Sequence, residues 1–240
     1  MAQNSHIEWT DATWNPVTGC TKISIGCQNC YAERLAKRLQ AMGNPRYSEG
    51  FKLRIHEDLI DLPSRWKKPK MVFVNSMSDL FHEDIPEQFI NDVFNTMKNN
   101  YHHIFQVLTK RSNRLQIIPP KLWDDNIWMG ITIEAEEYLF RVEELRQTGA
   151  RTRFISFEPL LDRIPEFNMS GIDWVIVGGE TGPNARPMKK EWAIEIRNRC
   201  IEQNIPFFFK QWGGIRSKQE GRILEGEVWE QYPMREGRLL

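Results

Sequence analysis

Short apolar runs recur along the chain, and each is followed by polar turn residues and then by a longer segment with helical spacing. Most of these runs are continuously apolar rather than alternating, which is typical of parallel strands covered on both faces. The expected strands cover residues 13–17, 71–75, 103–108, 127–133, 152–157, 174–177 and 206–209. The expected helices cover residues 31–42, 87–99, 135–148 and 190–203.

The alternation of strands and helices predicts the fold class, which is α/β with crossover connections and a parallel sheet. Six or seven such units fit a complete or partial TIM-like (β/α) barrel best, and a doubly wound open sheet is the alternative. No repeat or linker divides the 240 residues, so residues 1–212 are expected to form one domain. Residues 213–240 are Gly-rich and charged, and strand-like pieces at 222–224 and 228–232 predict a hairpin in a C-terminal extension packed on that domain.

Polar residues follow the expected strands, at the points where the chain leaves each of them. In a barrel or an open sheet the working face lies at these carboxyl ends, so we expect the residues to surround a site. The alternative is that they are ordinary loop residues and helix caps. They are Ser76, Ser78, Asp79, Thr109, Lys110, Arg111, Thr132, Glu134, Glu158, Gly178, Gly179, Glu180, Thr181, Lys210 and Gln211.

Three of the four cysteines form a C-x6-C-x2-C pattern directly after the first expected strand, at Cys20, Cys27 and Cys30. Thiolates are soft ligands that suit zinc or an iron–sulfur cluster. A closed structural zinc site needs a fourth protein ligand, and no candidate stands at a standard spacing. The candidates are His6, His56 and the distant Cys200. A four-iron cluster with three thiolates leaves one iron open, and three metal-free cysteines are the remaining alternative.

The three-cysteine loop, whose last cysteine is followed by an aromatic residue and a helix, resembles the radical S-adenosylmethionine superfamily. Several longer stretches are similar to an uncharacterised bacterial and phage-borne family that is grouped with it, and the core is distantly similar to spore photoproduct lyase, a thymine-dimer repair enzyme. The similarity runs from Glu8 to Gly214. The stretches are EWTDATWNPVTGC, GCQNCYAERLA, VFVNSMSDLFHEDIP, QVLTKR, GITIE, ISFEPLL, DWVIVGGETGPNARPM and FFFKQWGG.

The resemblance implies that Cys20, Cys27 and Cys30 hold three irons of a [4Fe-4S] cluster and that S-adenosyl-L-methionine binds the fourth. One electron, which an external donor supplies to the cluster, then cleaves this cofactor to a 5′-deoxyadenosyl radical that abstracts hydrogen from a substrate. Tyr31 occupies the place where superfamily members often have an aromatic residue beside the adenine. The first cysteine gap differs from the usual C-x3-C-x2-C spacing.

Other cofactor-binding roles are expected only from positions at the strand ends. We expect the residues after the second strand to bind the methionine amino group, with Asp79 as the charged acceptor. Lys110 would pair with a carboxylate or a phosphate, and Glu134 or Glu158 would accept ribose hydroxyls. A Gly178-Gly179-Glu180 motif stands after a later strand than in the superfamily, so it is assigned to neither cofactor nor substrate. The expected cofactor-binding residues are Tyr31, Ser76, Ser78, Asp79, Lys110, Glu134 and Glu158.

Charge gives the only indication of a substrate. The chain has 32 Lys and Arg against 32 Asp and Glu, which excludes a basic field over the whole molecule. Residues 31–70 nevertheless hold ten basic and five acidic residues, a net charge of +5, with aromatic residues between them. This segment predicts contact with a phosphate backbone and unpaired bases, and the alternative is an ordinary solvated surface.

Two functions are therefore expected. The first is a radical enzyme that acts on DNA, RNA or a nucleotide, in repair or modification, with no catalytic residue assigned. The alternative is a zinc- or cluster-stabilised nucleic-acid-binding module without redox catalysis. The chain has no apolar run of membrane-spanning length and begins with polar residues, so it is expected to be cytoplasmic, without a membrane span or signal peptide.

Overall fold

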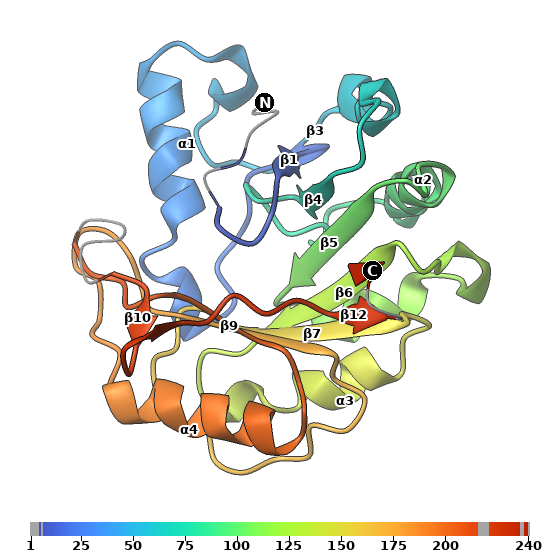
Figure 1. Cartoon of the computed structure of the whole chain (residues 1–240). Helices are drawn as coiled ribbons and strands as arrows, with labels where there is room; N and C mark the ends of the chain where they lie inside the picture. The colour runs from blue at the N-terminus through green and yellow to red at the C-terminus, as the bar shows by residue number, and fades with distance from the viewer. Residues whose placement is uncertain (1–4, 6, 216–220, 236–237, 240) are drawn as a thin grey trace.

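Seven parallel strands form one curled sheet, a partial TIM-like barrel, in the order β1-β4-β5-β6-β7-β8-β9 (Figure 1). The computed structural model describes residues 5, 7–215, 221–235 and 238–239. The partial barrel is the architecture expected from the alternation of strands and helices, and neither a complete barrel nor a doubly wound sheet forms. The strands are β1 Ala12–Trp14, β4 Met71–Val74, β5 Ile104–Thr109, β6 Ile127–Thr132, β7 Thr152–Phe157, β8 Trp174–Gly178 and β9 Phe207–Gln211.

Helices cover the outer side of the curled sheet, where α2, α3 and α4 lie in Figure 1. Alternate strand residues, such as Val72 and Val74 of β4, join these helices in one large apolar core. No helix among the described residues is long and apolar enough to cross a membrane. The helices are α1 Tyr31–Ala41, α2 Glu87–Asn99, α3 Arg141–Arg146 and α4 Lys190–Glu202.

Several connections between the strands are irregular, and in one of them a longer helix was expected. The expected helix over 135–148 is divided into a 3-10 turn and the short α3. The connections from β5 to β6 and from β7 to β8 contain no α-helix within residues 110–126 and 158–173, all of which are described. The 3-10 turns are η1 Ile25–Cys27, η2 Pro45–Tyr47, η3 Glu57–Leu59, η4 Pro63–Arg65, η5 Ser112–Ile117, η6 Pro120–Leu122 and η7 Glu136–Tyr138.

The first expected strand, over 13–17, is interrupted at Pro16. Proline has no backbone N–H to give to a strand ladder, so β1 ends at Trp14. The chain then forms β2 (Val17–Thr18), which pairs antiparallel with β3 (Arg54–Ile55) outside the main sheet. This small pair leads directly into the segment that carries the three cysteines.

Aromatic side chains fill the inner face of the sheet near the amino ends of its strands. Trp128, Phe154, Trp174 and Phe208 come from the first halves of β6, β7, β8 and β9, and Trp9 packs against them from the N-terminal segment. A Cβ on Gly130 of β6 would lie 2.4 Å from the ring of Phe154, so the packing of this ring requires glycine here. These aromatic side chains thus fill the interior of the half barrel near the amino ends of the strands.

The C-terminal extension forms short hairpins, with β10 (Ile223–Leu224) against β11 (Glu227–Val228) and β12 (Met234–Arg235) against β13 (Arg238–Leu239). The first is the hairpin expected around Gly226, with both strands shorter than expected and the second beginning at Glu227. Glu225 and Gly226 both have positive φ, as a two-residue hairpin turn of this kind requires. Phe208 of β9 forms a bridge with Glu230, so the extension contacts the main sheet. The boundary between residues 212 and 213 stays a prediction.

Candidate functional site

A cavity of about 670 Å³ opens at the carboxyl ends of the parallel strands. Its size lies within the range of about 300–1,000 Å³ that is usual for ligand sites. Cys20, Cys27 and Cys30 line one part of it. The strand ends supply most of the remaining wall, as the sequence indicated. The expected site residues among the lining are Tyr31, Ser76, Ser78, Asp79, Lys110 and Glu158, whereas Glu134 lies fully buried behind it.

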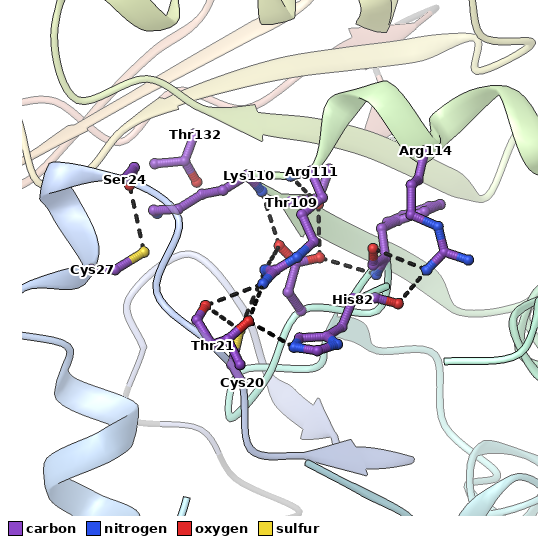
Figure 2. Close-up of polar contacts among 12 residues, drawn as sticks. Cys20, Thr21, Ser24, Cys27, His82, Thr109, Lys110, Arg111, Arg114 and Thr132 are labelled. Atoms are coloured by element: carbon purple, nitrogen blue, oxygen red, sulfur yellow. Dashed lines mark hydrogen bonds and ion pairs between the residues drawn. The ribbon is translucent and has the colours of Figure 1, made fainter. Parts of the chain in front are cut away.

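The segment from residue 20 to residue 30, here called the cysteine loop, connects β2 to α1. The sulfurs of Cys20 and Cys27 each have a polar neighbour (Figure 2). The Cys20 Sγ accepts a hydrogen bond from Arg111 at 3.4 Å, and the Cys27 Sγ lies 3.4 Å from the Ser24 hydroxyl. Cys30 is the residue directly before the first turn of α1.

Asp79 fixes the beginning of the cysteine loop through Arg111. Its Oδ1 accepts hydrogen bonds from the Thr109 hydroxyl and the Phe81 amide, and its Oδ2 accepts from the Lys110 amide. The same Oδ2 lies 3.4 Å from the Arg111 guanidinium, which donates to the Thr21 hydroxyl at 2.8 Å and reaches Cys20. Figure 2 shows Arg111 extending to Thr21 and Cys20.

The environment of Cys20 keeps its thiol protonated when no cation is bound. Burial and the negative charge of Asp79 raise the pKa of Cys20 to about 11, although Arg111 acts in the opposite direction. A bound metal cation would reverse this balance, because ligation requires the thiolate.

Glu134 fixes the middle of the cysteine loop. Its Oε1 accepts a hydrogen bond from the Ser24 hydroxyl at 2.6 Å and lies 3.4 Å from the Lys110 ammonium. Its Oε2 accepts from Arg141 at 2.9 Å, and both side chains of this pair are almost completely buried. A Cβ on Gly26 would lie 2.5 Å from the Glu134 side chain, so this glycine allows the loop to approach the carboxylate.

Glu180 fixes the end of the cysteine loop, which assigns a role to the unplaced Gly178-Gly179-Glu180 motif. Its Oε2 accepts a hydrogen bond from the Asn29 side chain at 3.0 Å. It also pairs with Arg186, which donates to the Ile25 carbonyl at 2.9 Å. Burial alone would raise the pKa of the Glu180 carboxyl, but the hydrogen bonds from Arg186 and Asn29 lower it below its usual value.

Three further expected residues line the cavity, and the hydroxyl group of each already donates one hydrogen bond within the protein. The Tyr31 hydroxyl donates to the Ser76 carbonyl, while the residue as a whole is 43% exposed. Burial raises the pKa of this hydroxyl. The Ser78 hydroxyl donates to the Val17 carbonyl at 2.9 Å, and the Ser76 hydroxyl donates to the Asn15 side chain at 3.2 Å.

Two lysines reach the cavity, and each pairs with a carboxylate. Burial alone would lower the pKa of the Lys110 ammonium, but Glu134 and Cys27 raise it above its usual value. Lys210 of β9 forms a hydrogen-bonded ion pair with the Oε1 of Glu158 at the end of β7. The Oε2 of Glu158 accepts no hydrogen bond from a described residue, so it can accept one from a ligand.

The candidates for a fourth zinc ligand lie elsewhere or have other partners. His56 is buried, and its Nε2 lies 2.8 Å from the Thr18 hydroxyl. Cys200 of α4 is part of the apolar core on the outer side of the sheet. His6 lies outside the described residues. In the described part of the chain, no group of three or more His, Cys, Asp or Glu side chains could hold one metal ion.

Several partners of Glu134 and Glu180 were missed by sequence reasoning, whereas those of Asp79 after β5 were among the expected site residues. Ser24, Gly26 and Asn29 stand inside the cysteine pattern, so their place in the loop was a usable signal. Arg141 and Arg186 carry no such signal, because each reaches its carboxylate from a separate segment after the strand end.

With this geometry established, comparison with known proteins identifies the family. A family model described as a protein of unknown function (DUF5131) matches residues 4–233. The chain belongs to this family. No curated protein matches the sequence.

Two solved structures of spore photoproduct lyase are similar to this DUF5131 member in fold. One is a mutant with bound AdoMet and dinucleoside spore photoproduct, with 12% identity, a TM-score of 0.50, and coverage of 83% of this chain and 76% of that chain. The other is a complex with dinucleoside spore photoproduct, with 12% identity, a TM-score of 0.49, and coverage of 81% and 74%. At this identity the first likeness shows a shared half-barrel fold.

Proposed function

We propose that this protein is a radical S-adenosylmethionine enzyme in which Cys20, Cys27 and Cys30 hold a [4Fe-4S] cluster, with a nucleic acid or nucleotide as substrate. One observation carries the proposal: the three cysteines and the polar strand ends of a half barrel line the same cavity. When bound and reduced by an external donor, the cluster would supply the electron that converts S-adenosyl-L-methionine into a hydrogen-abstracting radical.

The donor set supports the cluster. Three thiols on one loop are soft ligands, and each can bind a different iron, so they need not meet at a single ion as a zinc site requires. All three cysteines are partly exposed on a cavity wall rather than buried in the core. The positive groups of Lys110 and Arg111 lie beside the loop, where they would partly balance the negative charge of cluster-bound thiolates.

The chain's own residues then divide into positioning groups and binding groups. Both oxygens of Asp79 and of Glu134 already accept hydrogen bonds from the protein, so we assign them to holding the cysteine loop. Tyr31 offers a half-exposed ring on which a flat base can stack. Glu158 has an unused oxygen that can accept hydroxyl groups such as those of ribose.

The choice of a nucleic acid or nucleotide is supported by the fold. The solved structure of spore photoproduct lyase that is similar in fold to this chain has bound AdoMet and dinucleoside spore photoproduct. A cavity of about 670 Å³ in this chain is large enough for a cofactor and part of a substrate. We therefore assign the cavity to both.

The test is anaerobic isolation followed by iron, sulfide and product analysis. The proposal expects about four iron and four sulfide per chain, as in a [4Fe-4S] cluster. It also expects 5′-deoxyadenosine when a reductant and S-adenosyl-L-methionine are added, with and without single-stranded DNA or RNA. A reconstituted protein that holds iron and sulfide but never cleaves S-adenosyl-L-methionine would contradict it.

Cysteine variants give the matched comparison. Alanine at Cys20, Cys27 or Cys30 should remove most of the bound iron, because each replacement removes one ligand of the cluster. Cys200→Ala should retain the iron, since Cys200 lies in the core beneath α4. One tightly bound zinc per chain and no sulfide would select the nucleic-acid-binding module without redox catalysis instead.

A further inference from the structure

Three of the ten basic residues in 31–70 are neutralised by acidic residues of the same segment. The sequence suggested a continuous basic surface with aromatic stacking groups, but Tyr47 and Trp66 are buried. Several of its cations pair with carboxylates of the same segment. These ion pairs are Lys37–Glu33, Arg46–Asp58 and Lys52–Glu49. These paired cations and the two buried aromatic residues are therefore less available to a nucleic acid than the rest of the segment.

Arg34 and Arg38 of α1 differ from these paired cations, because both line the cavity and neither pairs with a carboxylate of a described residue. The Arg34 guanidinium donates to the backbone carbonyls of Thr181 at 2.6 Å and Asn29 at 3.3 Å, and to no carboxylate of the described chain. Gly182 leaves the space in which this guanidinium lies. Arg38 is exposed, and its side chain has no hydrogen bond or ion pair with any described residue.

These two charges distinguish the α1 side of the cavity from the rest of its wall. The other cations of the lining, Lys110, Arg111 and Lys210, each face a carboxylate. Arg34 and Arg38 have no carboxylate partner among the described residues, so the α1 side of the cavity attracts an anion. The backbone carbonyls hold Arg34 in place while leaving part of its five-donor guanidinium free.

The surface between these arginines suits a nucleic acid strand. Arg34 and Arg38 are four residues apart, so they lie on one face of the helix with a rise of about 6 Å. That rise is comparable with the distance between successive phosphates of an extended strand. Leu35 is 40% exposed on the same face and also lines the cavity, which gives an apolar surface for a base or sugar beside the charges.

We propose that Arg34 and Arg38 bind successive phosphates of a single-stranded nucleic acid and so position one nucleotide unit over the cavity. The inference rests on the proposed function, because it places the substrate of the same site. It adds the substrate class, a phosphodiester strand rather than a free base or an isolated nucleotide. It also names the two side chains that recognise the strand.

The test measures binding of a fluorescein-labelled single-stranded DNA, twelve nucleotides long, to the full chain by fluorescence anisotropy over a range of salt concentrations. Arg38→Gln should weaken binding several-fold and reduce the slope of log affinity against log salt by about 0.7, the value for one lost phosphate contact. Lys37→Gln is the matched control. Lys37 is the preceding residue of α1, is exposed, and pairs with Glu33 instead of lining the cavity.

Three outcomes would overturn the inference. The first is equal weakening by Arg38→Gln and Lys37→Gln, which would indicate only a general surface field. The second is an unchanged salt slope for Arg38→Gln. The third is displacement of the strand by a nucleoside monophosphate at an equal phosphate concentration, which would show that a single phosphate suffices. None of these affects the iron, sulfide and 5′-deoxyadenosine measurements, so failure here is distinguishable from failure of the proposed function.

Discussion

At the scale of single residues, Glu134 is the expected site residue whose charge is most deeply buried. Its side chain is completely buried and accepts hydrogen bonds from Ser24 and Arg141. Glu134→Gln keeps the size of the side chain but leaves the buried Arg141 guanidinium without its anion. Breaking a buried pair in this way costs about 3–5 kcal/mol, so we expect the free energy of unfolding in urea to fall by that amount.

Glu136→Gln is the control for this prediction. Glu136 stands two positions further along, is exposed, and forms no ion pair with a described residue. Its replacement should change the free energy of unfolding by less than about 0.5 kcal/mol, as is usual for surface sites. Equal stabilities for the two variants would show that the pair with Arg141 contributes nothing.

The same residue shows what a sequence can and cannot indicate at this scale. The position of Glu134 after a strand predicted that it would lie at the carboxyl end of the sheet, and it does. Its orientation was not predictable, because it depends on Arg141, which reaches back from α3 to the carboxylate and to the Thr132 carbonyl. Strand periodicity fixes the level of a side chain along the sheet, but not the partner that turns it toward the cavity or away from it.

At the scale of elements, the position of the cysteine loop depends on close contact at Gly26. In Gly26→Ala the new Cβ would lie 2.5 Å from Glu134, which Arg141 holds in place, so the loop itself must move. Overpacking of this kind costs about 1–3 kcal/mol. We expect a lower free energy of unfolding and, in addition, a lower iron content per chain after anaerobic reconstitution.

Gly171→Ala separates these two effects. Gly171 has a φ of 75°, and an added Cβ there would meet no neighbour within 4 Å. Its replacement should cost about 1–2 kcal/mol from backbone strain alone and leave the iron content unchanged. If Gly26→Ala retains as much iron as Gly171→Ala, the contact at Gly26 does not position the loop.

The bounds of a helix or strand were predictable where its apolar residues keep a single periodicity over its whole length. The helix over 87–99 has the predicted bounds, because its apolar residues follow helical spacing without interruption. The expected helix over 135–148 is divided into a 3-10 turn and the short α3, whose first residue, Arg141, binds Glu134. The sequence prediction thus fails next to the cavity, whereas local sequence preference and fold agree at α2.

At the scale of the whole molecule, the sequence did not decide between a complete barrel, a partial barrel and an open sheet. Parallel strands covered on both faces read alike in an open sheet and in a barrel. The difference depends on side chains far apart in the sequence, since Trp9 and Tyr232 from opposite ends of the chain pack on Trp174 of the inner face. These contacts fill the interior near the amino ends of the strands, and most of the cavity wall comes from residues at the carboxyl ends.

The buried histidines make the stability of the whole molecule depend on pH. Burial lowers the pKa of His56 and of His103 below the ordinary value of about 6.5. Positive neighbours act in the same direction, because Arg46 and Arg54 face His56. Its carboxylate neighbour, Asp58, acts in the opposite direction without reversing the shift. Both imidazoles therefore prefer the neutral form in the folded chain.

Because the unfolded chain takes up these protons more readily, the free energy of unfolding should be constant near pH 7.5 and fall as the pH decreases below about 6.5. Each histidine contributes at most about 1.4 kcal/mol per pH unit. Urea unfolding at several pH values between 7.5 and 5 measures this slope above the range in which carboxylates titrate. His103→Gln should reduce the slope, whereas the exposed His102→Gln should not. A stability that stays flat down to pH 5 in the unmodified chain would show that these imidazoles accept protons in the folded state.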